Sequence, residues 1–473
     1  MVQTVGVDRG DEPRCLRMVA DEGEGRSHPA PLPCRTMDAL GDWSNAAARA
    51  PRASFLAEVR AAGALHGSAP VCTHRTPLLL PATTVRAFRR ILPPMHRLLR
   101  RVRERMLADV DRGPESLAAA LGVSPDAMAW ARIDPGFPDV APLARLDAFV
   151  EEGIPRFLEL NAESPAGMGY ASVLGPLLAA DPAARGWQGL DFVDPLPLVV
   201  STFRALAREW LVRTEASRRG VGFGRHFRVA IVDCAGVATA PEFDILAAGF
   251  RAQGHPADVV TPDELSFDGD RLRARGAPVD VLYRRFLVAD LRRDPTPFAP
   301  VLAAIRTQRV CMVNSLRTAL LHSKGVFAHL HSKGFAVTPA ERRFIERHVP
   351  LTLLCDDDAR ERVRREPERW VLKPVDGHGG RGVVLGWEVG RAAWERAVDE
   401  AEGCVLQRRV RGSDGLFFDA RDEAIHRRAI DLGPFLARGR FAGFLCRVVE
   451  GSLANVSAGG ASQVPVFSYT RRP

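Results

Sequence analysis

The sequence Trp-Val-Leu-Lys-Pro-Val-Asp-Gly-His-Gly-Gly-Arg-Gly at residues 370–382 predicts a phosphate-binding loop between two strands. Strand-forming residues lead into Lys373, and four of the six residues from Gly377 to Gly382 are glycine. Backbone N–H groups in such a loop can approach phosphate oxygens closely because no Cβ intervenes. The segment is not a P-loop, since no Gly-Lys-Ser/Thr opens a helix. The alternative is an ordinary glycine-rich hairpin with a surface lysine.

The rarity of lysine favours the phosphate-binding interpretation. Of the 65 Lys and Arg residues, only Lys324, Lys333 and Lys373 are lysine, so an ordinary surface cation in this chain is an arginine. A lysine at the root of a glycine-rich loop supplies a compact cation where phosphate would lie.

Composition sets the class of protein. The chain has 473 residues, of which 46% are hydrophobic and 26% charged, so we expect about three compact units in a soluble globular protein. No run approaches the ~18 apolar residues of a membrane span, and Met1 to Arg17 shows no apolar signal segment. We therefore expect a cytoplasmic location and no membrane partner. The eight cysteines form no close pair in sequence, and we expect them to be reduced packing residues.

A net charge of +8 raises the possibility of a nucleic-acid partner. The densest basic stretch, Met95 to Met106, places its apolar residues on one helical face and most of its arginines elsewhere, with Pro94 at the expected first turn. No aromatic residues interleave with these arginines. The pattern favours a packed amphipathic helix with a solvated arginine face, and we expect no nucleic-acid partner.

A hairpin carries the second candidate site. Residues 145–150 and 156–161 read as strands joined at 151–153. In a strand, Glu159 and Asn161 share one face while Leu158 and Leu160 point into the core. With Asp147 on the preceding strand, they offer the hard oxygen ligands that Mg²⁺ prefers. The alternative is a solvated outer face of the hairpin.

From Phe227 the pattern alternates between strand and helix as far as Asn314, which predicts a small α/β domain with a largely parallel sheet. The glycines of 220–224 precede its first strand, so they cannot cradle a dinucleotide pyrophosphate. Arg284 and Arg285 end a strand of this sheet, where ligands bind in open sheets, and could hold a substrate carboxylate. Surface salt bridging is the alternative for both arginines.

Several motifs together resemble a known family. Val313 through Lys324, the Lys373-Pro-x-Asp-Gly-x-Gly-Gly run, and Asp431 through Arg447 to Gly460 are similar, in that order, to the ATP-binding half of bacterial glutathione synthetase. Glu159-Leu-Asn161 with Arg145-x-Asp147 resembles the metal-binding end of the same ATP-grasp fold. Here that end precedes the ATP-binding part. The arrangement, over roughly residues 140–467, resembles the circularly permuted ATP-grasp proteins related to glutathionylspermidine synthetases.

The resemblance implies an α/β, circularly permuted ATP-grasp fold with a Rossmann-like pre-ATP-grasp domain. We expect a poorly ordered extension at 1–50, a helical region with the permuted metal-binding part at 51–215, the Rossmann-like domain at 225–320, and the ATP-binding lobes at 321–473.

The resemblance also implies roles for individual residues, with ATP and Mg²⁺ as cofactors. Lys324 and Lys373 would hold ATP phosphates, and Gln407 would lie near the adenine. Asp147, Glu159 and Asn161 would hold magnesium. Arg447 and Asn455 would stabilise charge during the reaction. The loop glycines that would close over the phosphates are Gly377, Gly379, Gly380 and Gly382, and the substrate residues would be Arg284, Arg285, Gly459 and Gly460.

The implied activity is an ATP-dependent, ADP-forming ligase that joins the carboxylate and the amine of small-molecule or peptide substrates through an acylphosphate. Two departures favour an alternative, a nucleotide-binding regulatory or degenerate protein without turnover. Arg408 stands where an acid often binds ribose, and Gly433 follows Asp431-Leu where an Asp-Leu-Arg pattern is more familiar.

Overall fold

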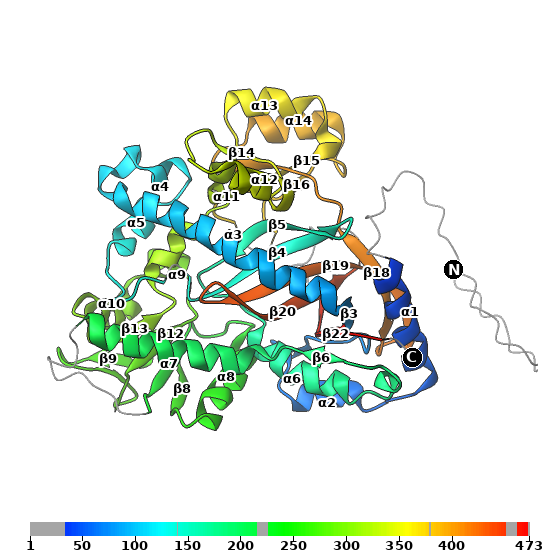
Figure 1. The fold of residues 1–473 in the computed structure, drawn as a ribbon. Helices are drawn as coiled ribbons and strands as arrows, with labels where there is room; N and C mark the ends of the chain where they lie inside the picture. Colours follow the sequence, from blue (N-terminus) through cyan, green and yellow to red (C-terminus); the bar gives the residue numbers. More distant parts are fainter. Residues whose placement is uncertain (1–33, 140, 215–225, 378–379, 451–460, 472–473) are drawn as a thin grey trace, which may run out of the picture.

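The computed structural model describes residues 34–139, 141–214, 226–377, 380–450 and 461–471. Their three largest sheets are one of six strands and two of four strands, and the four-stranded sheet that contains β14, β15 and β16 is uppermost in the view of Figure 1. None of the helices in these ranges combines the length and the apolar character that crossing a bilayer requires.

The central feature is a six-stranded sheet that joins two distant parts of the chain. Its strand order is β21-β20-β19-β4-β5, with β18 also paired to β19, and every pairing is antiparallel. The early hairpin β4–β5 therefore completes a sheet built by the last quarter of the chain (Figure 1). The strands are β4 (Leu143–Glu151), β5 (Ile154–Asn161), β18 (Ser413–Asp419), β19 (Ala424–Ala437), β20 (Arg440–Val449) and β21 (Ala461–Val464).

The predicted hairpin is confirmed. Its turn is Glu152-Gly153, and both residues have positive φ, at 51° and 79°. That backbone matches the right-handed twist of the flanking strands.

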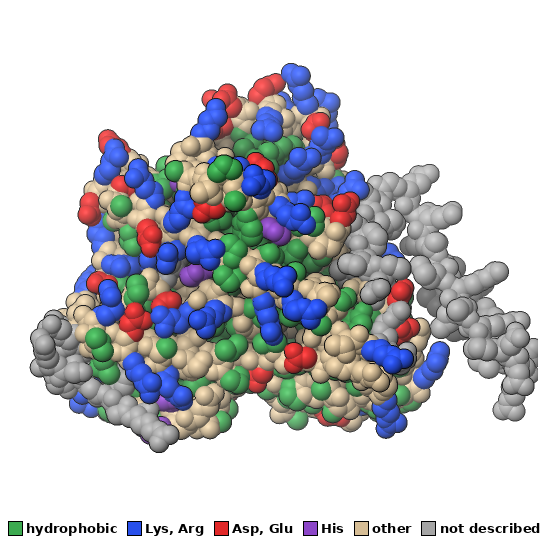
Figure 2. Space-filling view, in the orientation of Figure 1, with side chains coloured by type: hydrophobic (Ala, Val, Ile, Leu, Met, Phe, Trp, Pro, Cys, Tyr) green, Lys and Arg blue, Asp and Glu red, His purple; other side chains and the backbone are tan. Residues whose placement is uncertain are grey.

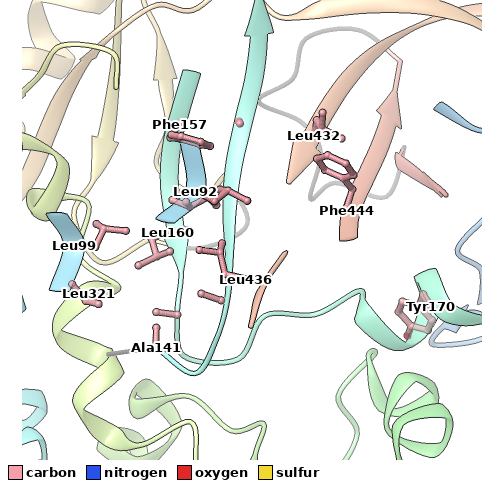
Figure 3. Packing of buried hydrophobic residues seen from close by; sticks show 14 of the residues in the cluster. Leu92, Leu99, Ala141, Phe157, Leu160, Tyr170, Leu321, Leu432, Leu436 and Phe444 are labelled. Atoms are coloured by element: carbon pink, nitrogen blue, oxygen red, sulfur yellow. The ribbon is translucent and has the colours of Figure 1, made fainter. Parts of the chain in front are cut away.

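Helix α3 (Ala82–Ala108) covers one face of the central sheet. Leu92 and Leu99 of the helix lie near Phe157 and Leu160 of β5 and Leu436 of β19 in the buried cluster drawn in Figure 3. The expectation that the helix begins at Pro94 is wrong, because it begins at Ala82 and continues through Pro93 and Pro94. Its apolar period extends back through the buried Phe88 and Val85, and that packing outweighs the backbone hydrogen bonds that proline removes.

The arginines of α3 mostly face solvent, as the amphipathic pattern predicts. Arg97, Arg100 and Arg105 are exposed, whereas Arg103 is buried and donates to the carbonyls of Pro138 and Asp139. Figure 2 shows Lys and Arg side chains spread over the visible face rather than gathered in one patch.

The parallel sheet expected after Phe227 is present. Its strand order is β13-β12-β7-β8, and all of its pairings are parallel. Residues at the carboxyl ends of these strands form hydrogen bonds with the segment that follows β5. The glycines of 220–224 lie outside the described residues. The strands are β7 (Val229–Val232), β8 (Ala257–Val260), β12 (Val281–Arg284) and β13 (Cys311–Val313).

A separate four-stranded antiparallel sheet, the small sheet, carries Lys373. Its order is β14-β17-β15-β16, and one face packs on α13 (Asp357–Arg364) and α14 (Arg391–Asp399) through the buried Trp370, Trp394 and Leu406. The strands are β14 (Thr352–Leu354), β15 (Trp370–Pro374), β16 (Val384–Leu385) and β17 (Cys404–Arg408).

Smaller sheets and the remaining helices complete the fold. The minor strands are β1 (Leu65–His66), β2 (Ala69–Pro70), β3 (Leu78–Pro81), β6 (Asp191–Phe192), β9 (Leu265–Phe267), β10 (Leu272–Ala274), β11 (Ala277–Pro278) and β22 (Val466–Tyr469). The other helices are α1 (Cys34–Arg49), α2 (Phe55–Ala61), α4 (Leu117–Ala120), α5 (Pro125–Ala131), α6 (Met168–Ala179), α7 (Pro195–Arg213), α8 (Ala240–Ala252), α9 (Val288–Arg293), α10 (Ala299–Arg306), α11 (Gly325–His331), α12 (Pro339–His348), α13 (Asp357–Arg364) and α14 (Arg391–Asp399).

Helix α1 corrects the expectation of a poorly ordered extension over residues 1–50, of which 1–33 lie outside the described ranges. Trp43 is fully buried, stacks near Phe467, and donates its indole N–H to the carbonyl of Arg75 at 2.9 Å. Ser44 shares a 2.8 Å hydrogen bond with Thr76. The sequence around α1 shows no sustained period, but tertiary packing on β18 and β3 supplies the stability that local propensity lacks.

Replacing Trp43 with alanine tests whether α1 is part of the fold. We expect Trp43→Ala to lower the free energy of unfolding by about 3–5 kcal/mol, because it leaves a large cavity and unpairs the Arg75 carbonyl. Urea unfolding followed by circular dichroism measures the loss. Val212→Ala, at a side chain that is 80% exposed, is the control and should stay within experimental error of the parent. Equal midpoints for the two variants would contradict the assignment of α1 to the core.

Candidate active site

A buried ion cluster lies where β4 meets β19 and β20. Asp147 is 5% exposed. Arg145 donates hydrogen bonds to both of its carboxylate oxygens, from Nε to Oδ1 at 2.5 Å and from Nη2 to Oδ2 at 3.1 Å. Arg447 of β20 donates Nη2 to Asp147 Oδ2 at 3.0 Å and also to the carboxylate of Asp431, its cross-strand partner. Two guanidinium groups and two carboxylates thus meet within three adjacent strands.

The charges in this cluster stabilise one another. Burial alone would raise the pKa of Asp147, but Arg145 and Arg447 outweigh it and lower that pKa to about 2. Burial and the charge of Asp147 raise the pKa of Asp431 against the opposing effect of Arg447. Despite burial, both carboxylates hold the pKa of Arg447 above its ordinary value. Asp147 and Arg447 are therefore ionised throughout the physiological range.

Gly433 makes room for Arg145. A Cβ at Gly433 would lie 2.9 Å from Arg145 Cδ and 3.1 Å from Asp147 Oδ1, closer than ordinary van der Waals contact. The glycine that departs from the Asp-Leu-Arg pattern therefore has a steric reason in this chain. From the sequence, Arg145 was named only as part of a motif, and its pairing with Asp147 was not predicted. The signal available was its two-residue spacing from Asp147 on a strand, which places both side chains on one face.

Lys324 connects the central sheet to the glycine-rich loop. Its ammonium lies 3.3 Å from Glu159 Oε2 and donates to the carbonyl of Gly377 at 2.5 Å. Its backbone N–H donates to Val375 at 3.0 Å, and the residue as a whole is 8% exposed. The predicted phosphate ligand therefore lies between the predicted metal ligand and the loop.

Lys373 is held by Gln407 of the neighbouring strand. Lys373 donates to Gln407 Oε1 at 2.8 Å, and Gln407 Nε2 donates at 3.1 Å to both Thr352 Oγ1 and the carbonyl of Leu158. Gln407 is 3% exposed, so its amide links the small sheet to β5. That Gln407 lies near the adenine stays a prediction.

A β-bulge in β5 sets the direction of Glu159. Asp147 lies opposite Glu159, but the next pair is Ala148 with Phe157, so Leu158 is the extra residue. Leu160 is buried as predicted, whereas Leu158 is only half-buried and presents its carbonyl to Gln407. The expectation that Leu158 points into the core is wrong because strict alternation ends at the bulge.

Opposing charges shift the pKa values of the facing groups. Burial lowers the pKa of Lys373 to about 8, with Lys324 adding to the effect and Glu159 opposing it. Burial would raise the pKa of Glu159, but Lys324 and Lys373 outweigh it and lower that pKa. Lys373 therefore loses its proton just above neutral pH unless a bound anion stabilises the charged form.

Asn161 completes the set of expected metal ligands. It lies opposite Arg145 in the hairpin, and its Nδ2 is buried without a hydrogen-bond partner in the described part of the chain. One end of this amide is thus available to a ligand, in either orientation of the group. Two carboxylates and an amide match the hard oxygen donors that Mg²⁺ prefers, so these residues fit the expected ion.

The described part of the glycine-rich loop has the expected backbone. Gly380 and Gly382 both have φ of 72°, in the left-handed region that favours glycine. A Cβ at Gly382 would lie 2.8 Å from Pro374 Cγ. Gly379, Asn455, Gly459 and Gly460 lie outside the described residues.

Arg284 and Arg285 are buried, which excludes the surface salt bridges that were the alternative for them, whereas their expected substrate role stays a prediction. Arg284 is fully buried and donates to the carbonyl of Asn314 at 2.9 Å and to Thr318 Oγ1 at 2.8 Å. Arg285 is 3% exposed and donates to the carbonyl of Pro165 at 2.9 Å. The sequence could not show that the segment after β5 would cover this end of the parallel sheet and use both arginines.

These arginines anchor the segment that follows Asn161. Arg284 also reaches Glu163 at 3.3 Å, and the Asn314 amide donates to the carbonyl of Ala162 at 2.8 Å. Arg145 donates to the carbonyl of Ala166 at 3.1 Å. The parallel sheet therefore fixes the chain immediately beside the ion cluster.

Comparisons with known proteins agree with this architecture. Residues 250–457 match the model of the family described as circularly permuted ATP-grasp type 2. A solved glutathione synthetase-like effector from Globodera pallida aligns over 92% of this chain and 97% of its own, with a TM-score of 0.53 and 11% identity. The chain has a circularly permuted ATP-grasp fold.

Two curated relatives share a shorter stretch with this chain. A putative glutamate–cysteine ligase 2-2 of Frankia casuarinae is 36% identical over 139 residues, and a putative glutamate–cysteine ligase 2-3 of Frankia alni is 32% identical over 136 residues. Each match covers 28% of this chain and 15% of the relative. The chain thus aligns with about a seventh of the length of the curated relatives it matches.

The fit of Arg145 beside Gly433 can be tested by a double-mutant cycle. We expect Gly433→Ala to destabilise the protein by about 1–3 kcal/mol, because the new methyl group presses on Arg145 and Asp147. In an Arg145→Ala background most of that cost should disappear. Urea unfolding of the four proteins measures the coupling.

Gly41→Ala serves as the control for the cycle. A Cβ at this position in α1 meets no atom within 4 Å, so the variant should be at least as stable as the parent. An equal cost of Gly433→Ala with and without Arg145 would contradict the steric account.

Proposed function

We propose that the protein is an ATP-dependent, ADP-forming ligase that joins a carboxylate to an amine. The observation that carries the proposal is the convergence of Lys324, Lys373 and Arg447 with Asp147 and Glu159 from segments up to 300 residues apart. Phosphoryl transfer needs positioning and charge neutralisation more than a dedicated nucleophile. A site of lysines, carboxylates, arginine and a glycine-rich loop supplies both.

The lysines would bind ATP phosphates by exchanging partners. Lys324 now contacts Glu159 and Gly377, and Lys373 contacts Gln407. A triphosphate offers each ammonium a stronger, fully charged acceptor. The backbone of the loop from Gly377 to Gly382 would add N–H donors to the same phosphates.

Asp147, Glu159 and Asn161 would hold Mg²⁺ with the nucleotide. The ion would neutralise charge on the phosphate oxygens. Arg145 would keep the Asp147 carboxylate in place, since its guanidinium already engages both oxygens.

The proposed reaction has two steps. A substrate carboxylate oxygen attacks the γ-phosphorus of ATP, which gives an acylphosphate and ADP. The amine nitrogen then attacks the acyl carbon, releases phosphate and loses a proton. Arg447 would stabilise the charge that develops, because its Nε is buried and has no hydrogen-bond partner among the described residues while its side chain is 26% exposed.

The curated relatives support a ligase as the class of enzyme. Both are named as putative glutamate–cysteine ligases, and the family match is to an ATP-grasp model. We therefore propose small-molecule or peptide substrates that carry a carboxylate and an amine. An ATP-binding protein without turnover is the second candidate, favoured by the exposed Arg408 at the end of β17. Gly433 does not favour this second candidate, because the Arg145 side chain occupies the space that a larger residue at position 433 would need.

Release of ADP from ATP, measured against a panel of amino acids and short peptides as carboxylates and amines, tests the proposal. A ligase sustains ADP release over many turnovers only when both substrates are present, because the amine must consume the acylphosphate before the next cycle, and mass spectrometry identifies the amide. Tight ATP binding with no ADP release from any pair would favour the second candidate. No measurable ATP binding would contradict both.

The role of Arg447 predicts a loss confined to the chemical step. We expect Arg447→Ala to lower kcat by about 10²-fold while leaving ATP affinity within a few-fold, because the group acts on charge that develops during the reaction. Arg447→Lys should also be impaired, since lysine lacks the planar fork. Arg440→Ala, at an exposed position on the same strand, is the matched control. Near-parental turnover of Arg447→Ala would remove the residue from the mechanism.

The low pKa of Lys373 predicts a pH dependence of nucleotide binding. The free protein loses the Lys373 proton as pH rises through about 8, so ATP affinity should fall about tenfold between pH 7 and pH 9. Lys373→Arg should flatten this profile, because arginine stays charged. Calorimetric titration at both pH values measures the change, with Lys333→Ala expected to follow the parent. A parental profile in Lys373→Arg would assign the pH dependence to another group.

A further inference from the structure

Two cysteines that are distant in sequence lie directly opposite each other at the end of the small sheet. β14 and β17 are antiparallel with Leu354 opposite Val405, so the next pair outward is Cys355 and Cys404. The backbone N–H of Cys355 donates to the carbonyl of Cys404 at 3.1 Å. The six described cysteines are all free thiols, and Cys355 and Cys404 meet although they are far apart in sequence.

The spacing of such a pair suits a disulfide. Opposing residues that share a backbone hydrogen bond in an antiparallel pair have Cα atoms about 5.5 Å apart. Disulfides span Cα separations of about 4.4–6.8 Å, most often near 5.5–6 Å. Adjustment of the two side-chain rotamers would therefore bring the sulfurs together without moving either strand.

Both thiols project from the same face of the sheet. Cys355 continues the alternation of Leu351 and Leu353, and Cys404 continues that of Leu406, and these side chains pack against the cluster beneath α13 and α14. Both cysteines are only half-buried, whereas Cys72, Cys311 and Cys446 are buried. A small reagent can therefore reach this pair in the folded protein.

Arg360 of α13 lies over the pair. Its Nη2 donates to the carbonyl of Ala401 and reaches that of Cys355, and its Nε is buried without a partner in the described ranges. Burial raises the pKa of both thiols, and the guanidinium acts in the opposite direction on each. The pKa of each thiol therefore stays above its ordinary value, and exchange begins from a small thiolate fraction that the guanidinium increases.

We propose that Cys355 and Cys404 are a redox site that forms a reversible intramolecular disulfide. One thiolate attacks a sulfur of a small-molecule disulfide, RSSR, to give a mixed disulfide and one RSH. The second cysteine then attacks the protein sulfur of that mixed disulfide and expels the second RSH. The protein loses two electrons and two protons in all, and one RSSR becomes two RSH.

The crosslink would act on the sheet that carries Lys373. Residues between the two cysteines include β15, β16 and the glycine-rich loop, so the disulfide closes the whole of this region into a covalent ring. The backbone N–H of Val375, at the root of the loop, donates to the carbonyl of Gly403, next to Cys404. The oxidised protein should therefore hold the edge strand β14 and the root of the loop more firmly than the reduced protein.

Exchange of the folded protein with 2-hydroxyethyl disulfide tests the proposal. After alkylation of the remaining thiols and proteolysis without reductant, mass spectrometry should detect a peptide pair linked through Cys355 and Cys404, and dithiothreitol should reverse the link. The melting temperature of the oxidised full chain should rise by about 3 °C or more. Slower hydrogen exchange of residues 352–356 and 404–408 should accompany it.

Single variants make the test decisive. Cys355→Ser and Cys404→Ser should each abolish the linked peptide and leave the other cysteine as a mixed disulfide with the reagent. Cys234→Ser, at another half-buried thiol, should retain the link. Mixed disulfides on both Cys355 and Cys404 of the parent without the internal link would overturn the proposal. So would a link that appears only after denaturation.

Discussion

The carboxylate of Asp147 is the point on which the rest of the site depends. A buried charge must be paired, and here Arg145 and Arg447 provide that pairing from β4 and β20. Arg447 on β20 reaches across β19 to Asp147 on β4, and Asp431 on β19 binds the same guanidinium. Gly433 leaves the space that Arg145 needs. The pairing thus requires that a hairpin from the first third of the chain lies beside strands from the last quarter.

The small sheet and the parallel sheet both contact the same hairpin or the segment that follows it. Gln407 ties the small sheet to the bulge at Leu158, and Lys324 joins Glu159 to the loop root at Gly377. On the opposite side, Arg284 and Arg285 hold the segment that continues from Asn161. These links join the hairpin to the other sheets or to the segments beside them, so movement of any one sheet would alter the spacing between the lysines and the carboxylates.

Much of this arrangement could be predicted because its signals are local or lie in known motifs. The hairpin, the parallel sheet and the strand ending at Lys373 follow from periodicity and glycine placement, and the order of motifs indicated the permuted fold. Helix α1 and the true start of α3 could not be predicted, since tertiary packing overrides local propensity there. The bulge at Leu158, the opposition of Cys355 to Cys404 and the burial of Arg284 depend on register and coverage, which one sequence does not reveal.

Hydrogen–deuterium exchange with and without MgATP tests most directly whether these segments form one nucleotide site. The account predicts that added MgATP slows exchange at the same time in residues 143–161, 324–331, 370–377 and 404–408, because all four contact the bound nucleotide or its ligands. The Glu159→Gln variant should lose most of this protection together in all four segments. Protection confined to the glycine-rich loop, or protection of the hairpin that persists in Glu159→Gln, would contradict the account.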